Sequence, residues 1–155
     1  MKVSEAMTRD VRIASPDETI FDAARAMAAL DGGVLPVADK DRVIGILTDR
    51  DIAVRAVATR KGPDTPIRDV MTKDVKYCYE DEDLEHVASN MGDIRVRRLL
   101  VVNRDKRLVG IVSIGDIAAV KPRAAAAEAI AGVSRPGGPH SQGLAPPVPP
   151  SLEGW

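Results

Sequence analysis

The sequence predicts an α+β protein that contains two β-α-β-β-α repeats, and three observations favour this fold class. First, "MTRDV" (7–11) returns as "MTKDV" (71–75), and "GILTDRDIA" (45–53) returns as "GIVSIGDIA" (110–118). Second, short runs of alternating apolar residues are separated by stretches with helical spacing. Third, the composition changes after residue 122, where the repeats end.

The two copies align with a shift of 64 residues, which becomes 65 near the middle of each copy. Met27 aligns with Met91 at the first shift, and Asp51 aligns with Asp116 at the second. The extra residue lies within the polar turns, which read "DKDRVIG" (39–45) in copy 1 and "NRDKRLVG" (103–110) in copy 2. Because surface turns tolerate insertions, this change of register supports the duplication.

Each copy is expected to begin with a helical turn, at 4–7 and 68–71, followed by an extended segment with alternating apolar residues. A helix comes next, and Thr19 or Asp17 can cap the first of these helices. The alternating positions are Val11 and Ile13 in copy 1 and Val75 and Tyr77 in copy 2. The helical positions are Ile20, Ala24, Met27 and Leu30 in copy 1, and Leu84, Val87, Ala88 and Met91 in copy 2.

Two apolar strands joined by a polar turn follow each of these helices: "VLPVA" and "VIGIL", then "RLLVV" and "LVGIV". Second helices, at about 49–60 and 114–120, close the copies, and the breaker-rich "KGPDTP" links them. A copy of about 60 residues buries little surface alone. We therefore expect the copies to pack sheet-to-sheet with pseudo-two-fold symmetry, leaving a cleft between them.

The predicted domains are 1–62 and 63–122 for the two repeats. An Ala-rich helix over 123–135 has a thin apolar stripe and is expected to dock on the body or on a second subunit. The stripe consists of Ala125, Ile130 and Val133. Residues 136–155 contain six prolines and four glycines, so we expect a disordered tail.

The overall composition disfavours several classes of protein. The net charge of −1 lacks the basic excess of a duplex nucleic-acid binder. Only 3% of residues are aromatic, which argues against single-strand binding through the Arg/Lys cluster at 95–107. The single cysteine excludes a disulfide within the chain, and no segment is apolar enough to be a signal peptide or membrane span. We expect a cytoplasmic protein without membrane contact.

The repeated stretch has a structural and a functional interpretation. Thr48 and Ser113 follow a strand and precede a helix, with Asp51 and Asp116 three residues later, so each pair can form a capping box worth about 1 kcal/mol. The same helix N-terminus attracts phosphate. A carboxylate beside it suits a ribose, because two vicinal hydroxyls can donate to it. The alternating strand positions, Val11 with Ile13 or Val75 with Tyr77, can supply an apolar slot for adenine.

The paired "MT.DV" openings and the two Gly-h-x-Thr/Ser-x-x-Asp stretches resemble a tandem pair of cystathionine β-synthase (CBS) domains over about residues 1–120. The resemblance implies sheet-to-sheet packing and homodimers shaped as flat discs. It also implies binding of AMP, ADP, ATP or S-adenosylmethionine in clefts between the repeats. Asp51 and Asp116 would then hold ribose hydroxyls, and Thr48 and Ser113 would lie near ribose or phosphate.

The copies differ where Arg97 and Arg98 replace Gly33 and Val34. Arginine suits phosphate because of its planar fork of donors. The alternative is a solvated edge strand whose charge prevents aggregation. We expect unequal sites, with the phosphate-preferring one using Arg97 or Arg98.

The favoured hypothesis is a regulatory module that binds an adenosine-containing ligand and is not an enzyme. We expect no catalytic residue and no required cofactor. The acidic run at 80–85 is interpreted as a helix start rather than a metal site. The alternative is a protein-interaction scaffold with degenerate, ligand-free pockets. A homodimer is expected, and a protein partner is possible for either hypothesis.

Overall fold

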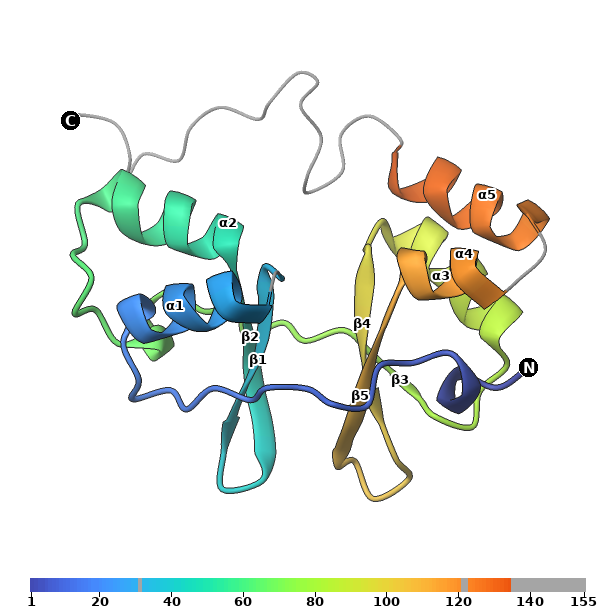
Figure 1. Ribbon diagram of the computed structural model, residues 1–155, viewed down its shortest axis with the longest axis horizontal. Helices are drawn as coiled ribbons and strands as arrows, with labels where there is room; N and C mark the ends of the chain where they lie inside the picture. Colours follow the sequence, from blue (N-terminus) through green and yellow to red (C-terminus); the bar gives the residue numbers. More distant parts are fainter. Residues whose placement is uncertain (31, 121–122, 135–155) are drawn as a thin grey trace. The chain divides into compact units, whose positions relative to one another are not determined.

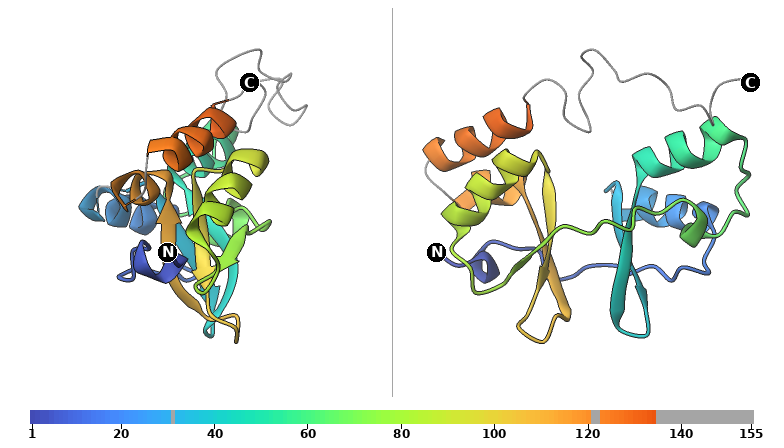
Figure 2. Two further views of the ribbon diagram at one scale, coloured as in Figure 1. Left: turned by 90° about the vertical axis from the view of Figure 1, so that its right-hand side faces the viewer. Right: turned by 180° about the vertical axis from the view of Figure 1, so that it is seen from behind.

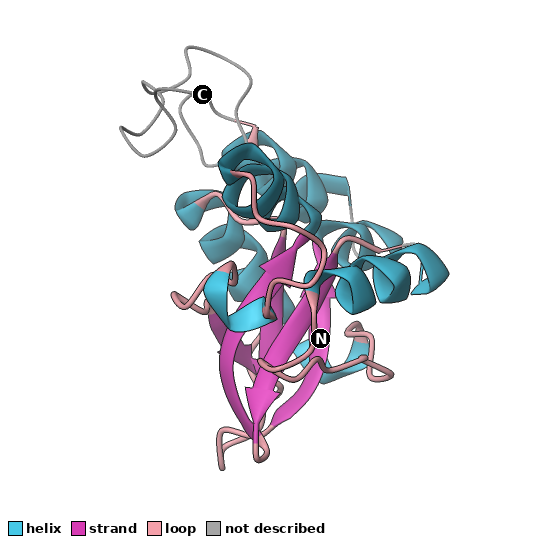
Figure 3. Cartoon of the chain, turned by 90° about the vertical axis from the view of Figure 1, so that its left-hand side faces the viewer, coloured by secondary structure: helices cyan, strands magenta, loops and turns pink. Residues whose placement is uncertain are grey.

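The computed structural model describes residues 1–30, 32–120 and 123–134, and their helices and strands form an α+β fold (Figures 1 and 3). The helices and hairpins follow the predicted order in both repeats. The predicted tail, 136–155, lies outside the described residues. Helices α1, α3 and α5 have 11 residues each, and no helix in the described part is long and apolar enough to cross a membrane.

The chain forms two compact units that do not coincide with the two sequence repeats. Residues 11–75 form one unit, which contains the hairpin of repeat 1. Residues 1–10 join the part of the chain that begins at residue 76 and form the other unit, around the hairpin of repeat 2. The predicted domain ranges, 1–62 and 63–122, follow the sequence repeats. In the structure, the opening segment of each repeat belongs instead to the unit that contains the hairpin of the other repeat.

The unit of residues 11–75 contains one helix, a two-stranded antiparallel sheet and a second helix of mixed winding. Between Ala14 and Val37 there is only an isolated parallel bridge, so the predicted extended segment at 11–13 is not a strand. The elements are α1 (Ile20–Leu30), β1 (Val34–Asp39), β2 (Arg42–Thr48), α2 (Asp49–Asp51) continuing as π and 3-10 turns (Ile52–Ala56, Val57–Thr59), and a 3-10 turn at Ile67–Asp69.

The other unit contains a three-stranded sheet in the order β3-β4-β5, with β3 parallel to β4 and β4 antiparallel to β5. The extended segment of repeat 2 is therefore a true strand, in contrast to repeat 1. The elements are a 3-10 turn at Val3–Glu5, β3 (Tyr77–Tyr79), α3 (Leu84–Ile94), β4 (Arg98–Val102), β5 (Leu108–Ser113), α4 (Ile114–Val120) and α5 (Arg123–Val133).

The buried face of α3 matches the prediction, since Leu84, Val87, Ala88 and Met91 are all in the core. The predicted face of α1 is partly wrong. Ala23 and Ala26 are buried with Ile20 and Met27, whereas Ala24 is exposed and Leu30 is 53% exposed. Alanine is common on every side of this helix, so apolar spacing alone does not determine the buried face.

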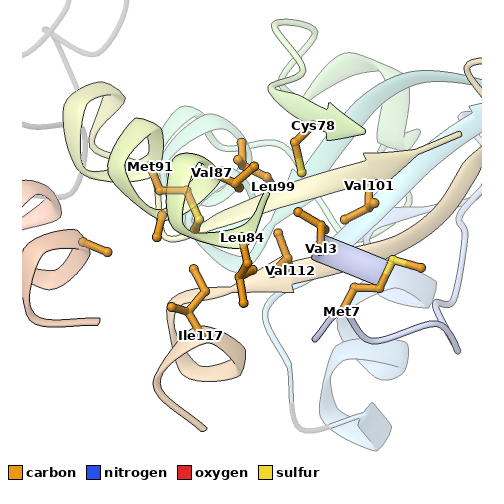
Figure 4. Close-up of a cluster of buried hydrophobic side chains, with 12 residues drawn as sticks. Val3, Met7, Cys78, Leu84, Val87, Met91, Leu99, Val101, Val112 and Ile117 are labelled. Carbon is orange, nitrogen blue, oxygen red and sulfur yellow. The ribbon is translucent and has the colours of Figure 1, made fainter. Parts of the chain in front are cut away.

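Each opening segment packs on the hairpin of the unit to which it belongs. Thr8 exchanges two backbone hydrogen bonds with Ile111 of β5, at 2.8 and 2.9 Å, and Thr72 makes the same pair with Ile46 of β2. Figure 4 shows Val3 and Met7 among core side chains of α3, β4 and β5. We call residues 1–10 and 65–75 the straps.

The straps explain the repeated glycines. A Cβ on Gly110 would lie 2.7 Å from the Thr8 carbonyl oxygen and 2.8 Å from Met7 Sδ. A Cβ on Gly45 would meet Thr72 and Met71 in the same way, at 2.9 and 2.8 Å. These contacts are too close for any side chain, so glycine is required where each strap crosses its hairpin.

Helix α5 docks on α3 and α4 of its own unit, which agrees with the predicted extra helix (Figure 2). The predicted contact stripe is wrong at Ile130, while Val133 is half-buried. Ile130 is 46% exposed, whereas Ala129 is fully buried in the core. The side chain of Ala125 lies outside the described part of the chain. Alanine rather than isoleucine is therefore the fully buried side chain among those of this helix that are described.

Candidate functional site

In repeat 1, Thr48 and Asp51 form a reciprocal capping box where β2 enters the second helix. The Asp51 amide donates to Thr48 Oγ1, and the Thr48 amide donates to Asp51 Oδ2, both at 3.0 Å. The capping interpretation of this pair is correct geometrically. It satisfies one amide in the first turn of the helix and fixes the orientation of the carboxylate.

The Asp51 carboxylate has further partners that sequence reasoning did not find. The Thr72 hydroxyl lies 3.1 Å from Oδ1 and 3.3 Å from Oδ2, and Arg55 Nε lies 3.6 Å from Oδ1. Arg55 also donates to the Met71 carbonyl at 3.2 Å, so it joins the strap to the helix. Asp51 is only 8% exposed, and both of its oxygens are engaged.

In repeat 2, Ser113 and Asp116 form the equivalent box but use the carboxylate differently. The Ser113 amide and hydroxyl both donate to Asp116 Oδ2, at 2.8 and 2.9 Å, and the Asp116 amide donates to Ser113 Oγ at 3.1 Å. Oδ1 accepts no hydrogen bond from any described residue. By repeat alignment, Thr8 and Val120 stand where repeat 1 has Thr72 and Arg55, and neither donates a hydrogen bond to the Asp116 carboxylate. One carboxylate oxygen is therefore held and the other is available.

Arg97 and Arg98 lie beside the N-terminus of α4, which we call the α4 entrance; the corresponding N-terminus of α2 is the entrance of repeat 1. Arg98 is the direct cross-strand partner of Ser113, and the Arg97 carbonyl accepts a 3.1 Å hydrogen bond from the Ile114 amide. Both side chains are exposed, and neither forms an ion pair with a described residue. The structure thus brings Arg97, Arg98, Ser113 and Asp116 together in one unit.

The entrance in repeat 1 has a glycine and a carboxylate where repeat 2 has an arginine. Gly33 stands where repeat 2 has Arg97, and the Asp49 amide donates to the Gly33 carbonyl at 2.9 Å. A Cβ on Gly33 would lie 2.5 Å from Asp49 Oδ2, so a carboxylate fills the space beside this glycine. Asp49 and Asp51 therefore place two carboxylates at this entrance, and Arg55 lies beside the second of them.

The four residues predicted to form an apolar slot for adenine are divided between the two units. Tyr77 pairs with Leu100 in the sheet that also carries Arg98, and the residue is 45% exposed. The edge of its ring meets the Tyr79 ring with 5.8 Å between centroids. Val11, Ile13 and Val75 belong to the unit of Thr48 and Asp51; Val11 and Val75 are half-buried, and Ile13 is 48% exposed.

Other chemistry-bearing groups do not form sites within the described residues. Nowhere in that part of the chain do three or more His, Cys, Asp or Glu side chains gather as metal ligands. Cys78 is buried in the core, and burial, with a smaller contribution from Glu82, raises the pKa of its thiol to about 12. A thiol with this pKa is not a nucleophile near neutral pH. In the acidic run, Asp83 caps α3 by accepting from the Glu85 and His86 amides.

Comparison with known proteins agrees with this geometry. The CBS domain model matches the chain twice, at residues 3–57 and 67–122. The CBS domain-containing protein YhcV of Bacillus subtilis is 37% identical over 116 residues, covering 75% of this chain and 82% of its own. The crystal structure of the CBS domain protein TA0289 from Thermoplasma acidophilum matches with a TM-score of 0.75 and 30% identity, over 85% of this chain and 75% of that chain.

A second solved structure carries ligands. The CBS domain pair of protein MJ0100, in complex with 5'-methylthioadenosine and S-adenosyl-L-methionine, matches with a TM-score of 0.68 and 30% identity, over 77% of this chain and 94% of that chain. The two family matches coincide with the two repeats, and each contains one capping box at a helix entrance. The chain belongs to the CBS domain family and contains a tandem pair of these domains.

Proposed function

We propose that the chain is a regulatory module that binds an adenosine-containing ligand at the α4 entrance of repeat 2. The observation that carries the proposal is the state of Asp116. Two hydrogen bonds from Ser113 hold the carboxylate through Oδ2, and a third joins the Asp116 amide to Ser113 Oγ, while Oδ1 accepts none from the described residues. A vicinal diol supplies two hydroxyl donors for such an acceptor. Both ligands of the MJ0100 pair contain an adenosyl ribose, which is the group this chemistry recognises.

The charge beside Asp116 favours ligands that carry phosphate. Arg97 and Arg98 flank the entrance, and a guanidinium offers phosphate a planar fork of charged donors. S-adenosylmethionine presents a positive sulfonium to the same groups. We therefore infer that AMP, ADP or ATP binds more tightly than S-adenosylmethionine, with Tyr77 as an exposed aromatic surface for the base.

For repeat 1 the same reasoning supports a structural role. Asp51 is buried, its oxygens are engaged by Thr72 and Arg55, and Asp49 adds a second negative charge. A ligand would have to displace these partners before it could use the carboxylate. We propose that this entrance binds nucleotide much more weakly than the entrance of repeat 2.

The proposed activity is regulation rather than catalysis. The Ser113 hydroxyl donates to Asp116, but its oxygen also accepts from the Asp116 amide, so we interpret this pair as a capping box and not as a nucleophile with its base. Ligand binding would act by shifting the population of conformations toward the one that binds best.

Titration calorimetry with AMP, ATP and S-adenosylmethionine tests the proposal. We expect Asp116→Ala to weaken ATP binding at least about tenfold, because a charge-assisted hydrogen bond contributes about 1.5–3 kcal/mol. Asp93→Ala is the matched control, since it removes the same charge from an exposed site on α3. If the wild-type chain binds none of the three compounds, the proposal fails and the scaffold alternative gains support.

A further inference from the structure

We propose that ligand binding at Ser113 and Asp116 is coupled to the docking of α5 on α3 and α4. Helix α5 would thereby convert ligand binding in repeat 2 into a conformational change. This inference rests on the proposed function, because it assumes that the α4 entrance is a ligand site. It adds a specific conformational consequence that the site alone does not imply. The coupling depends on how α5 is attached to its unit.

The first step is the closeness of the α3–α5 contact. A Cβ on Gly132 would lie 2.6 Å from the carbonyl carbon and 2.5 Å from the carbonyl oxygen of Gly92. On the other side, a Cβ on Gly92 would meet the Glu128 carbonyl oxygen at 3.4 Å. The two helix backbones are therefore in direct contact at these glycines, and nothing larger fits between them.

The second step is the small apolar area that this contact buries. Among the side chains of α5 that are described, Ala129 alone is fully buried and apolar, while Ile130 is 46% exposed. Burial of apolar surface contributes about 25 cal/mol per Å², and alanine and glycine offer little of it. At these residues the contact is made by backbone and one methyl group, so docking depends on a close fit between the two helices.

The third step links α5 to the entrance. Ala129 belongs to the same core cluster as Ile117 of α4, and Ile114, the first residue of α4, packs against that cluster. Helix α4 has seven residues, and Ile117 is its fully buried side chain. Helix α5 therefore packs against a short helix, α4, and Asp116 lies in the first turn of α4. Docking of α5 and binding of ligand both favour an ordered α4, so each should strengthen the other.

Gly132→Ala tests the coupling. The new methyl group overlaps the Gly92 backbone, although alanine favours the helix itself by about 1 kcal/mol. Hydrogen exchange should show loss of protection at 127–134, and calorimetry should show ATP affinity lowered at least about fivefold, the lower end of typical coupling. Ala131→Gln is the matched control, because residue 131 is exposed on the same helix. It should change neither measurement.

The outcomes separate the two proposals. If α5 undocks in Gly132→Ala and ATP affinity is unchanged, the coupling is wrong while the proposed ligand site stands. If α5 stays protected in Gly132→Ala, the glycine contact does not hold it and the coupling is likewise wrong. If the wild-type chain binds no adenosine compound, the proposed function fails, and the coupling fails with it. In the wild-type chain, added ATP should raise the protection of residues 127–134.

Discussion

The two aspartates of the repeated stretch show how equal sequence positions acquire different roles. Asp51 and Asp116 both complete a capping box, as their spacing predicted. Their remaining contacts could not be predicted, because Thr72 comes from a strap 21 residues away in the chain. The signal was present in the sequence as the threonine of "MTKDV". Only the fold shows that this threonine reaches the first entrance.

This difference predicts opposite effects of the same substitution. Asp51→Ala should lower the free energy of unfolding by about 2–3 kcal/mol, because it leaves the Thr72 hydroxyl and the Thr48 amide without their acceptor in a buried place. Asp116→Ala should cost about 1 kcal/mol, the typical value of a lost cap. Urea denaturation measures both. Equal losses for the two variants would contradict the assignment of a structural role to Asp51.

The arginines give a prediction about ligand choice. Arg98→Ala should weaken binding of ATP at least about tenfold, since it removes a charge-assisted contact, and should leave 5'-methylthioadenosine binding nearly unchanged. Titration of both compounds into both proteins makes the comparison. The neutral ligand serves as the internal control. A similar loss for the two compounds would show that Arg98 acts on the fold of the entrance and not on phosphate.

Cys78 gives a prediction about pH. Its thiol pKa is raised to about 12 in the native state, mainly by burial, from an ordinary value of 9.0. In the unfolded chain the thiol ionises first, so stability should fall as pH rises from about 9 toward 12. The native thiol should also react with iodoacetamide far more slowly than the thiol in urea at pH 8. Equal rates in the two states would contradict the buried environment.

At the scale of elements, prediction was most accurate where residues of different size mark the two faces. Helix α3 has Leu84, Val87 and Met91 on one side, and its core face was predicted correctly. Helix α1 is rich in alanine, and its face was predicted only in part. The π-wound turn at Ile52–Ala56 has no counterpart in the regular helix α4. Apolar spacing does not distinguish these two windings, and Arg55, which lies within the π-wound turn, also donates to the strap.

The strap crossings give a prediction at this scale. Gly110→Ala should destabilise the protein by about 1–3 kcal/mol, the usual cost of overpacking. Adding Met7→Ala removes the contact with Sδ but leaves the clash with the Thr8 carbonyl oxygen. The part of the stability loss that comes from the Thr8 clash should therefore remain in the double variant. Thermal and urea unfolding measure these changes. Full stability in Gly110→Ala would contradict the close approach of the strap.

For the whole molecule, the sequence predicted two repeats but not the exchange of their opening segments. The internal alignment pairs each segment with its own repeat, since "MTRDV" opens the first and "MTKDV" the second. Nothing in that alignment indicates which hairpin each segment contacts. The exchange depends on contacts between residues far apart in the chain, such as Thr8 with Ile111.

Val3 and Ile67 provide a matched test of the exchange. They occupy equivalent positions in the two straps, and both are fully buried, but they belong to different core clusters. Val3→Ala should increase hydrogen exchange in β4 and β5, whereas Ile67→Ala should increase it in β1 and β2. If Val3→Ala instead loosens β1 and β2, the straps belong to their own repeats.

The placement of the first strap has a consequence for synthesis on the ribosome. The unit of residues 11–75 has all of its parts once residue 75 has emerged, so it can fold early. The first ten residues cannot find their partner strand until Ile111 has been translated. During that interval Val3 and Met7 remain apolar, unpaired and open to chaperones.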